Sequence, residues 1–301
     1  MKTILKPTLL ATAVILLCFS MTSWRSDEPT KDKWEHLLDL ELSQWDEFVG
    51  APHLTVDIEG YEKGNGMDEG TALGLNNDPL NVFSTVEIDG EPMLKISGEI
   101  YGAVTTKKEY ENYHLSLMFK WGEKKYEPRL DKPMDSGVLY HAIGEQGAFW
   151  NCWMQSQEFQ IQEEDCGDYY TIAGSGADIR AIKKENPNSD WDIFIYNPDS
   201  EYKQFKTGED GRCRKSENYG KLEGWNQIDL VCLGDKAYHI VNGKVVLVLE
   251  NSVTYGTDDV AKPLTKGKIQ LQSEGAEVYY KNIKIRSVNA LPSEFAKQLK
   301  S

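Results

Sequence analysis

A short acidic and amide-rich segment, residues 158–162 (EFQIQ), carries the side chains best suited to chemistry in this sequence. In an extended strand, successive side chains point to opposite faces, so Glu158, Gln160 and Gln162 share one face while Phe159 and Ile161 share the other. A carboxylate and planar amides are good partners for sugar hydroxyls, which need donors and acceptors together. We therefore expect a carbohydrate-facing sheet. Glu158 is its candidate general base or acid, the alternative being a substrate-binding or salt-bridged carboxylate, and the two glutamines are candidates for binding sugar.

Three further side chains are candidates for proton transfer or charge stabilisation. His141 is a candidate for the second proton-transfer group because imidazole titrates near neutral pH, and its alternative is a structural histidine. Asp168 follows Gly167 and is a candidate to orient His141 or to bind a cation, although Gly-Asp is also common turn chemistry. Lys107 is a candidate to polarise a keto oxygen, with an exposed lysine as the alternative.

Other polar and aromatic residues are candidates for holding a sugar ring. Gln270 and Gln272 alternate with Leu271 in the segment 268–274 and belong either to the same polar face or to a solvated one; Gln270 is the candidate for binding sugar, and Gln272 is expected to face solvent. Phe149, Trp150 and Trp153 come just before residues 158–162 and offer flat surfaces for a pyranose, although aromatic residues at a strand entry are equally common in cores.

Metal binding stays open at this point. The acidic cluster at residues 163, 164, 165 and 168 offers oxygen ligands but lacks the spacing of a calcium loop, so an ordinary acidic turn is favoured. A divalent ion between His141 and Glu158 is the other arrangement considered, because such an ion would polarise a ketone.

Composition limits the partners of this chain. Its 301 residues are 40% hydrophobic and 11% aromatic, which is enough to bury a core, and the formal net charge is −15. This acidity disfavours binding to nucleic acid or to anionic membranes. The cysteines at 152, 166, 213 and 232 lack zinc-ligand spacing. Cys232 is expected to be a core residue, and the sequence does not decide whether Cys152 and Cys166 form a disulfide.

The first residues have the pattern of an export signal. Lys2 and Lys6 precede an apolar run from about residue 9 to 19, and small residues follow at 20–23. We expect a signal peptide over residues 1–23 and no transmembrane helix, because the run is only about half of the roughly 20 residues that span a bilayer. Acylation of Cys18, giving a lipid anchor, is the alternative to a cleaved secretory signal. Either route predicts the periplasm or a bacterial cell surface.

The rest of the chain predicts one all-β domain over residues 24–301. Short runs rich in β-branched and aromatic residues recur between turn signals, and Asn242-Gly243 between two such runs is the strongest short hairpin signal. A sandwich of two antiparallel sheets, a jelly roll, is favoured over a propeller because there is no blade repeat. The expected strands are residues 93–97, 114–121, 137–141, 158–162, 225–233, 237–241, 244–249, 268–272 and 278–286.

Few helices and two loop insertions complete this prediction. The helix candidates are residues 293–300 and, less clearly marked, residues 33–40. Residues 123–134 are polar with two prolines, and residues 171–220 are long, charged and aromatic, so both are predicted to be loops added to the sandwich.

Several of these segments together resemble one family, that of the 3-keto-glucoside lyases and hydratases. The resemblance spans roughly residues 34–288 and is carried by segments that occur in the family's order: DSGVLYH at 135–141, EFQIQ at 158–162 with Gly167-Asp168, GWN at 224–226, VNG at 241–243, GKIQLQ at 267–272 and VYYKNIKI at 278–285. The resemblance implies a concanavalin-like jelly roll that cleaves 3-keto-glycosides outside the bacterial cytoplasm.

Two departures from the family pattern are visible. The family usually has Asn where this chain has Asp135, and commonly has Arg where this chain has His141, so a changed role or substrate preference follows at these positions. Three other functions remain as alternatives to the lyase. They are a retaining glycosidase, which needs two carboxylates about 5 Å apart, a lectin-like module without turnover, and a structural component of a surface complex.

Overall fold

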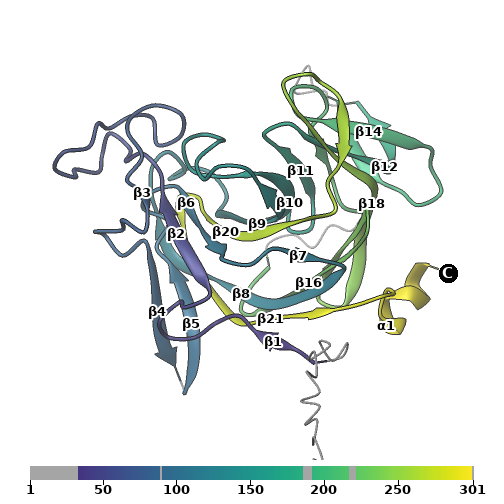
Figure 1. Cartoon of the computed structure of the whole chain (residues 1–301), viewed down its shortest axis with the longest axis horizontal. Coiled ribbons are helices and arrows are strands. Elements are labelled where there is room, and N and C mark those ends of the chain that lie inside the picture. Colours follow the sequence, from purple (N-terminus) through teal and green to yellow (C-terminus); the bar gives the residue numbers. More distant parts are fainter. Residues whose placement is uncertain (1–32, 89, 186–191, 217–221, 300–301) are drawn as a thin grey trace, which may run out of the picture. The chain divides into compact units, whose positions relative to one another are not determined.

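The computed structural model describes residues 33–88, 90–185, 192–216 and 222–299. Residues 31–301 form one compact unit. Its named strands pair antiparallel in two sheets, with twelve strands in one and nine in the other, and the sheets lie face to face (Figure 1). The expected all-β jelly-roll sandwich is confirmed. The predicted signal peptide, with Cys18, lies outside the described residues.

The two sheets draw their strands from the whole length of the described chain. The path of the larger sheet is β13-β12-β18-β17-β16-β8-β21-β5-β4, with β1, β14 and β19 at its margins, and that of the smaller is β15-β11-β10-β9-β20-β6-β2-β3, with β7 beside β20. The strand bounds are β1 Glu35–His36, β2 Trp45–Val49, β3 Gly74–Leu75, β4 Phe83–Ile88, β5 Glu91–Ile96, β6 Gly102–Thr106, β7 Tyr110–Glu111, β8 Tyr113–Lys125, β9 Asp135–Ile143, β10 Gln155–Gln162, β11 Tyr169–Ile172, β12 Ser175–Lys184, β13 Ile193–Tyr196, β14 Tyr202–Lys206, β15 Arg212–Cys213, β16 Asn226–Leu233, β17 Lys236–Val241, β18 Lys244–Tyr255, β19 Ala261–Pro263, β20 Lys266–Ser273 and β21 Ala276–Ser287.

All nine strands expected from the sequence are present, each within or overlapping a strand of the structure. The Asn-Gly hairpin is confirmed between β17 and β18, where Asn242 and Gly243 have φ of 48° and 80°. These positive angles are the ones that a tight two-residue hairpin requires. The C-terminal helix is confirmed as α1 (Ser293–Ala296), followed by a 3-10 turn over Lys297–Leu299.

Two expectations about local structure are wrong. The helix predicted at residues 33–40 is absent; β1 pairs there with β21 instead, so tertiary pairing overrides the local pattern. The segment 171–220 is not a loop insertion, since it contains β12, β13, β14 and β15, which widen both sheets. Its charged, aromatic composition fits edge strands, which keep polar side chains toward solvent.

The core lies between the two sheets. Phe159 and Ile161 of β10 are fully buried in it, as their alternation with the polar residues predicts. His239 of β17 crosses from the larger sheet: its ring stacks on Phe159 with ring centroids 4.4 Å apart, and its Nε2 hydrogen bonds with the Tyr140 hydroxyl at 3.0 Å. Burial lowers the pKa of His239 to about 4, so the ring is neutral in the core. One face of the smaller sheet therefore packs in the core, and the opposite, polar face of the sheet points outward.

The described residues also show the state of the cysteines and the lengths of the helices. Cys152, Cys166, Cys213 and Cys232 are all buried free thiols, so the disulfide left open by the sequence is not formed. Among the described residues, no helix is both long and apolar enough to cross a membrane.

Candidate functional site

A pocket of about 250 Å³ opens on the outward face of the smaller sheet, over β9, β10 and β20. One side of it is polar and one side is aromatic. Its lining consists of Arg129, Asp135, Phe149, Trp150, Trp153, Glu158, Gln160, Gln162, Tyr170, Thr171, Ile172, Gln272 and Glu274.

Glu158 lies at the centre of this pocket because strand geometry directs it there. It faces Leu139 of β9 on one side and Tyr170 of β11 on the other. Only 4% of the residue is exposed. A carboxyl group this deeply buried favours its neutral form, and burial together with the nearby charge of Asp135 raises the pKa of Glu158 to about 8.

Gly137 creates the space in which the Glu158 carboxyl group lies. A Cβ placed on Gly137 would lie 2.1 Å from Oε1 of Gln272 and 2.6 Å from Oε1 of Glu158. Both distances are far below van der Waals contact, so the two side chains meet above a backbone that has no side chain of its own. The Gln272 amide, from β20, is close enough to lower the Glu158 pKa in part.

A second carboxyl group of the pocket, Glu274, has a similar environment. Residues 270, 272 and 274 alternate along β20 and its end, so Glu274 shares the face of Gln272. Burial raises the Glu274 pKa to about 8, against the opposing charge of Arg129 and with a further contribution from Glu158. Glu274 in turn raises the pKa of Asp135, so these buried carboxyl groups do not titrate independently of one another.

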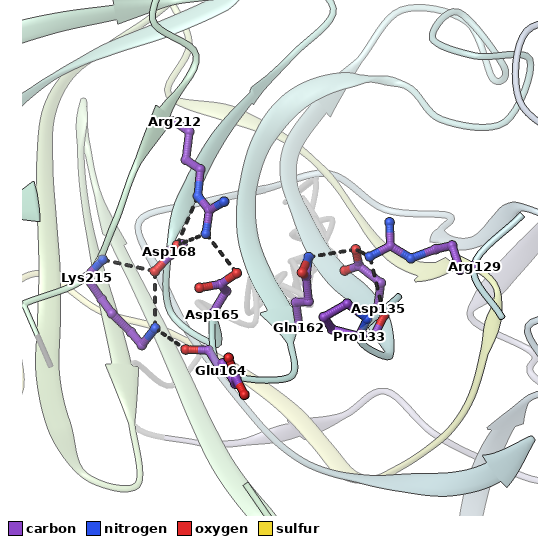
Figure 2. Close-up of polar contacts among 9 residues, drawn as sticks. All are labelled: Arg129, Pro133, Asp135, Gln162, Glu164, Asp165, Asp168, Arg212 and Lys215. Atoms are coloured by element: carbon purple, nitrogen blue, oxygen red, sulfur yellow. Dashed lines mark hydrogen bonds and ion pairs between the residues drawn. The ribbon is translucent and has the colours of Figure 1, made fainter. Parts of the chain in front are cut away.

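Arg129 supplies the positive charge of the pocket. Its guanidinium ion pairs with Asp135 at 2.5 Å and with Glu274 at 3.3 Å, and it is 14% exposed. Asp135 also accepts a hydrogen bond from Gln162 Nε2 at 2.8 Å, so its Oδ2 is held from both sides (Figure 2). Burial and the charge of Glu274 raise the Asp135 pKa well above its ordinary value, against the effect of Arg129.

Several polar atoms in the pocket are buried without a protein hydrogen bond. Within the described parts of the chain, this holds for Oδ1 of Asp135, Oε1 of Gln160, and both amide atoms of Gln272. Buried polar atoms are normally paired, since leaving one unpaired costs about 1–3 kcal/mol. All three residues line the same pocket, so a polar ligand such as a sugar could provide partners for them together.

The opposite wall of the pocket is aromatic. Trp150 is 39% exposed and stacks on Phe149 with centroids 4.7 Å apart. Trp153 is 2% exposed and donates from Nε1 to the carbonyl of Gly102 at 2.9 Å, so it supports the other two rings more than it offers a free face. Trp150 thus provides the flat surface, beside the carboxyl groups, on which an apolar sugar face can rest.

His141 lies outside this pocket, contrary to the expectation that it acts beside Glu158. A regular strand would put residues 135, 137, 139 and 141 on one face, but β9 has a register irregularity at this point and His141 has a φ of 52°. The bulge turns the ring into the core, where it packs 5.8 Å from Tyr113 and 5.5 Å from Tyr140. Its Nδ1 bonds the Leu264 carbonyl, and burial lowers its pKa to about 4.

Asp168 does not contact His141, and its cationic partners are protein side chains. It is fully buried and is bound by Arg212, whose Nη2 is 2.6 Å away, and by the backbone and Nζ of Lys215, at 3.0 and 3.3 Å (Figure 2). Arg212 also pairs with Asp165 at 2.9 Å. Asp168 is therefore the centre of an ion cluster that fastens the turn after β10 to β15.

Two of the predicted substrate-binding residues also lie elsewhere. Lys107 is exposed at the end of β6, and its Nζ donates to the Ser43 carbonyl at 2.8 Å. Gln270 is fully buried, and its amide is used up by Met154 N, Thr105 Oγ1 and Gln146 Oε1 at 2.9 to 3.1 Å. The remaining predicted residues, which are Glu158, Gln160, Gln162, Trp150 and Trp153, do line the pocket.

Several residues of the pocket were not predicted from the sequence, and the expectation for Gln272 is wrong. Gln272 was expected to face solvent but is fully buried in the pocket. Extending the alternation of β20 by two residues would have indicated both Gln272 and Glu274. Asp135 alternates with Gly137 and was noted only as a departure from the family pattern. Arg129 and Tyr170 reach the pocket through tertiary structure, and no local signal marks them.

A metal site was left open by the sequence. In the described residues, no group of three or more His, Cys, Asp and Glu side chains is arranged to hold a metal ion. The pair His141 and Glu158 is separated by the bulge in β9, and the acidic turn at residues 163–168 is occupied by Arg212 and Lys215, as expected of an ordinary turn.

Comparison with known proteins identifies the family of this chain. A family model described as the 3-keto-alpha-glucoside-1,2-lyase-like domain matches residues 33–286, which is most of the chain. Comparison with curated proteins gave no match.

Solved structures with related folds were also found. Two candidate glycosyl hydrolases from Parabacteroides distasonis ATCC 8503 are 21% and 17% identical, with TM-scores of 0.44 and 0.37; the alignments cover 85% and 77% of this chain and 100% and 90% of those chains. A beta-glucanase from Bacillus licheniformis is 11% identical with a TM-score of 0.35, covering 85% of this chain and 97% of that one.

Proposed function

Because this chain belongs to the 3-keto-alpha-glucoside-1,2-lyase-like family and is a carbohydrate-active domain, we propose that it cleaves glycosides whose glucose unit carries a ketone at C3. A base removes the C2 proton, and the electrons of that bond form an enolate with the C3 oxygen. The enolate collapses to expel the C1 substituent, whose oxygen takes a proton, and a C1 to C2 double bond is left. Water then adds at C1 while a proton returns to C2, so the overall change is hydrolysis.

Glu158 is the base at C2 in this proposal. The C2 proton of a 3-keto sugar is only weakly acidic, and a carboxylate with a pKa of about 8 is a much stronger base than an ordinary one. The single observation that carries the proposal is this buried carboxyl group above Gly137, facing a sugar-sized pocket with unpaired polar atoms.

Two neighbours have the chemistry that the remaining steps need. The amide of Gln272 lies beside Glu158 and lowers its pKa, and its Nε2 makes no other hydrogen bond in the described structure, so an N–H remains available to donate to the developing enolate oxygen. Glu274, with a pKa of about 8, is largely protonated at neutral pH and is the acid for the leaving oxygen. Arg129, which pairs with both Asp135 and Glu274, stabilises negative charge on this group of carboxyl side chains.

The test is the fate of the C2 hydrogen. The protein is incubated with a 3-keto-disaccharide in D2O, and the released sugar is analysed by NMR. Elimination and hydration predict one deuterium at C2, whereas direct hydrolysis by a retaining glycosidase would leave hydrogen there. A sample of released sugar without protein controls for spontaneous exchange. Binding without any release would instead indicate the lectin-like module and overturn the proposal.

We further propose that the protein acts outside the cytoplasm, on the basis of residues 1–23. Fractionation of a producing bacterium tests this, and mass analysis of the mature N-terminus separates a cleaved secretory signal from acylation at Cys18. A full-length chain in the cytoplasmic fraction would contradict export.

A further inference from the structure

The outward face of the larger sheet carries a row in which aromatic rings and lysines alternate across neighbouring strands. Trp225 directly precedes β16 and lies next to Lys120 of β8; Lys120 is paired with Tyr279 of β21, and Tyr279 with Lys95 of β5. The ammonium group of Lys120 lies 5.5 Å from the ring centroid of Trp225 and 5.8 Å from that of Tyr279. Lys281 approaches the Trp225 ring to 4.7 Å.

This row borders a hollow of about 480 Å³, larger than the pocket around Glu158. Gly122 of β8 contributes to the hollow, because a Cβ there would lie 2.1 Å from Oε2 of Glu277. Besides Glu277, its charged and aromatic lining includes Lys120, Lys124, Lys281, Glu123, Trp225 and Tyr279. It belongs to a different sheet from the pocket and shares no residue with it.

The charge of this hollow differs from that of the chain as a whole. The protein carries a formal charge of −15, yet lysines gather here. Lys95 pairs with Glu277 at 3.1 Å and Lys281 with Glu91 at 3.2 Å. Across the described residues, neither Lys120 nor Lys124 has a carboxylate within ion-pair distance, so at least two ammonium groups are available to an anionic ligand.

We infer that this hollow is a second carbohydrate-binding site, selective for saccharides that contain uronic acids. A uronate residue combines a carboxylate, which pairs with an ammonium group, with an apolar ring face, which packs on an aromatic ring. Each lysine of the row lies over a ring, so a ligand carboxylate that contacts Lys120 brings its sugar close to Trp225 or Tyr279. These two rings lie two strand spacings apart, about 10 Å, and suit a chain with repeated charges more than a single anion.

Affinity electrophoresis of the full chain tests the inference. Migration is measured in native gels containing polygalacturonate, neutral dextran or dextran sulfate. Polygalacturonate should retard the wild type and dextran should not. The double variant Lys120→Gln/Lys124→Gln should bind polygalacturonate at least about fivefold more weakly, because it removes both ammonium groups that lack a carboxylate partner. Trp225→Ala should weaken binding further by removing the ring.

Controls separate a binding site from general charge effects. Lys262→Gln removes one exposed lysine on β19, remote from this row in the sheet, and should migrate like the wild type. Thermal unfolding verifies that each variant is folded. Equal retardation of the wild type and the double variant would overturn the inference, as would retardation by dextran sulfate equal to that by polygalacturonate. Cleavage of a 3-keto-disaccharide should be unchanged in the double variant, so failure here is independent of the proposed function.

Discussion

The carboxyl group of Glu158 and the amide of Gln272 come from strands β10 and β20, and they meet above Gly137 of the strand between them. Three strands thus form this part of the pocket. The two outer strands carry the functional groups, and the glycine of the middle strand leaves the space in which they lie. The same arrangement explains the raised pKa of Glu158, because the carboxyl group is folded down against the sheet and away from water.

Replacing Glu158 by Gln should abolish turnover while leaving sugar binding in place. The amide has nearly the same shape but cannot accept the C2 proton, so kcat should fall by about 10²–10⁴-fold. Release of reducing sugar from a 3-keto-disaccharide measures this, together with calorimetric binding of the same compound. Glu47→Gln is a matched control, since Glu47 is a partly buried carboxyl group with a raised pKa in the same sheet but outside the pocket.

Gly137→Ala should impair activity much more than stability. The added methyl would meet the ends of two side chains rather than backbone, so both can swing aside at modest cost. We expect a loss of unfolding free energy of about 1–2 kcal/mol but a fall in kcat/KM of at least about tenfold, because Glu158 and Gln272 are displaced from each other. Urea unfolding and initial rates measure the two effects; a fully active variant would contradict the proposed roles.

The pH dependence of catalysis should form a bell centred near pH 8. Glu158 must be ionised and Glu274 protonated, and both have pKa values of about 8. Activity should therefore rise as pH increases toward 8 and fall above it, as expected when one group must be ionised and another protonated. A profile of kcat/KM from pH 5 to 10 measures this. A plateau from pH 5 to 7 would rule out Glu158 as the base.

Stability should fall with rising pH over a range set by the same two groups. Their pKa is about 8 in the folded protein against an ordinary value of 4.5. Between these values, the folded state binds more protons than the unfolded state, so the free energy of unfolding decreases as pH rises from about 4.5 to about 8. Glu158→Gln removes one such group and should raise the melting temperature relative to wild type more at pH 9 than at pH 5. An equal shift at both pH values would contradict the raised pKa.

His141 and Asp168 should behave as structural residues. His141→Asn leaves the pocket intact and should keep kcat within about threefold of wild type, since activity depends on groups in reach of the substrate. Asp168→Asn leaves Arg212 and Lys215 with an uncompensated charge and should cost about 3–5 kcal/mol of stability. Rates and urea unfolding of both variants, measured side by side, test this. A loss of kcat in His141→Asn with an unchanged KM and unfolding curve would place the imidazole back in the reaction.

The strands, the Asn-Gly hairpin and the polar face of residues 158–162 could all be predicted from the amino-acid sequence. These are local properties: side chains alternate with a period of two, and tight turns require particular residues. For this reason Glu158, Gln160 and Gln162 were placed correctly on one face, opposite Phe159 and Ile161.

Which of these residues come into contact depends on how the strands are arranged in space. The bulge at His141 reverses the direction of that side chain, and a one-residue change of register moves a side chain to the other face. Arg129 comes from the connection between β8 and β9, and Glu274 from the end of β20, so their contact depends on strand order. Burial, which raises the pKa of Glu158, exists only once the surrounding chain has closed over it.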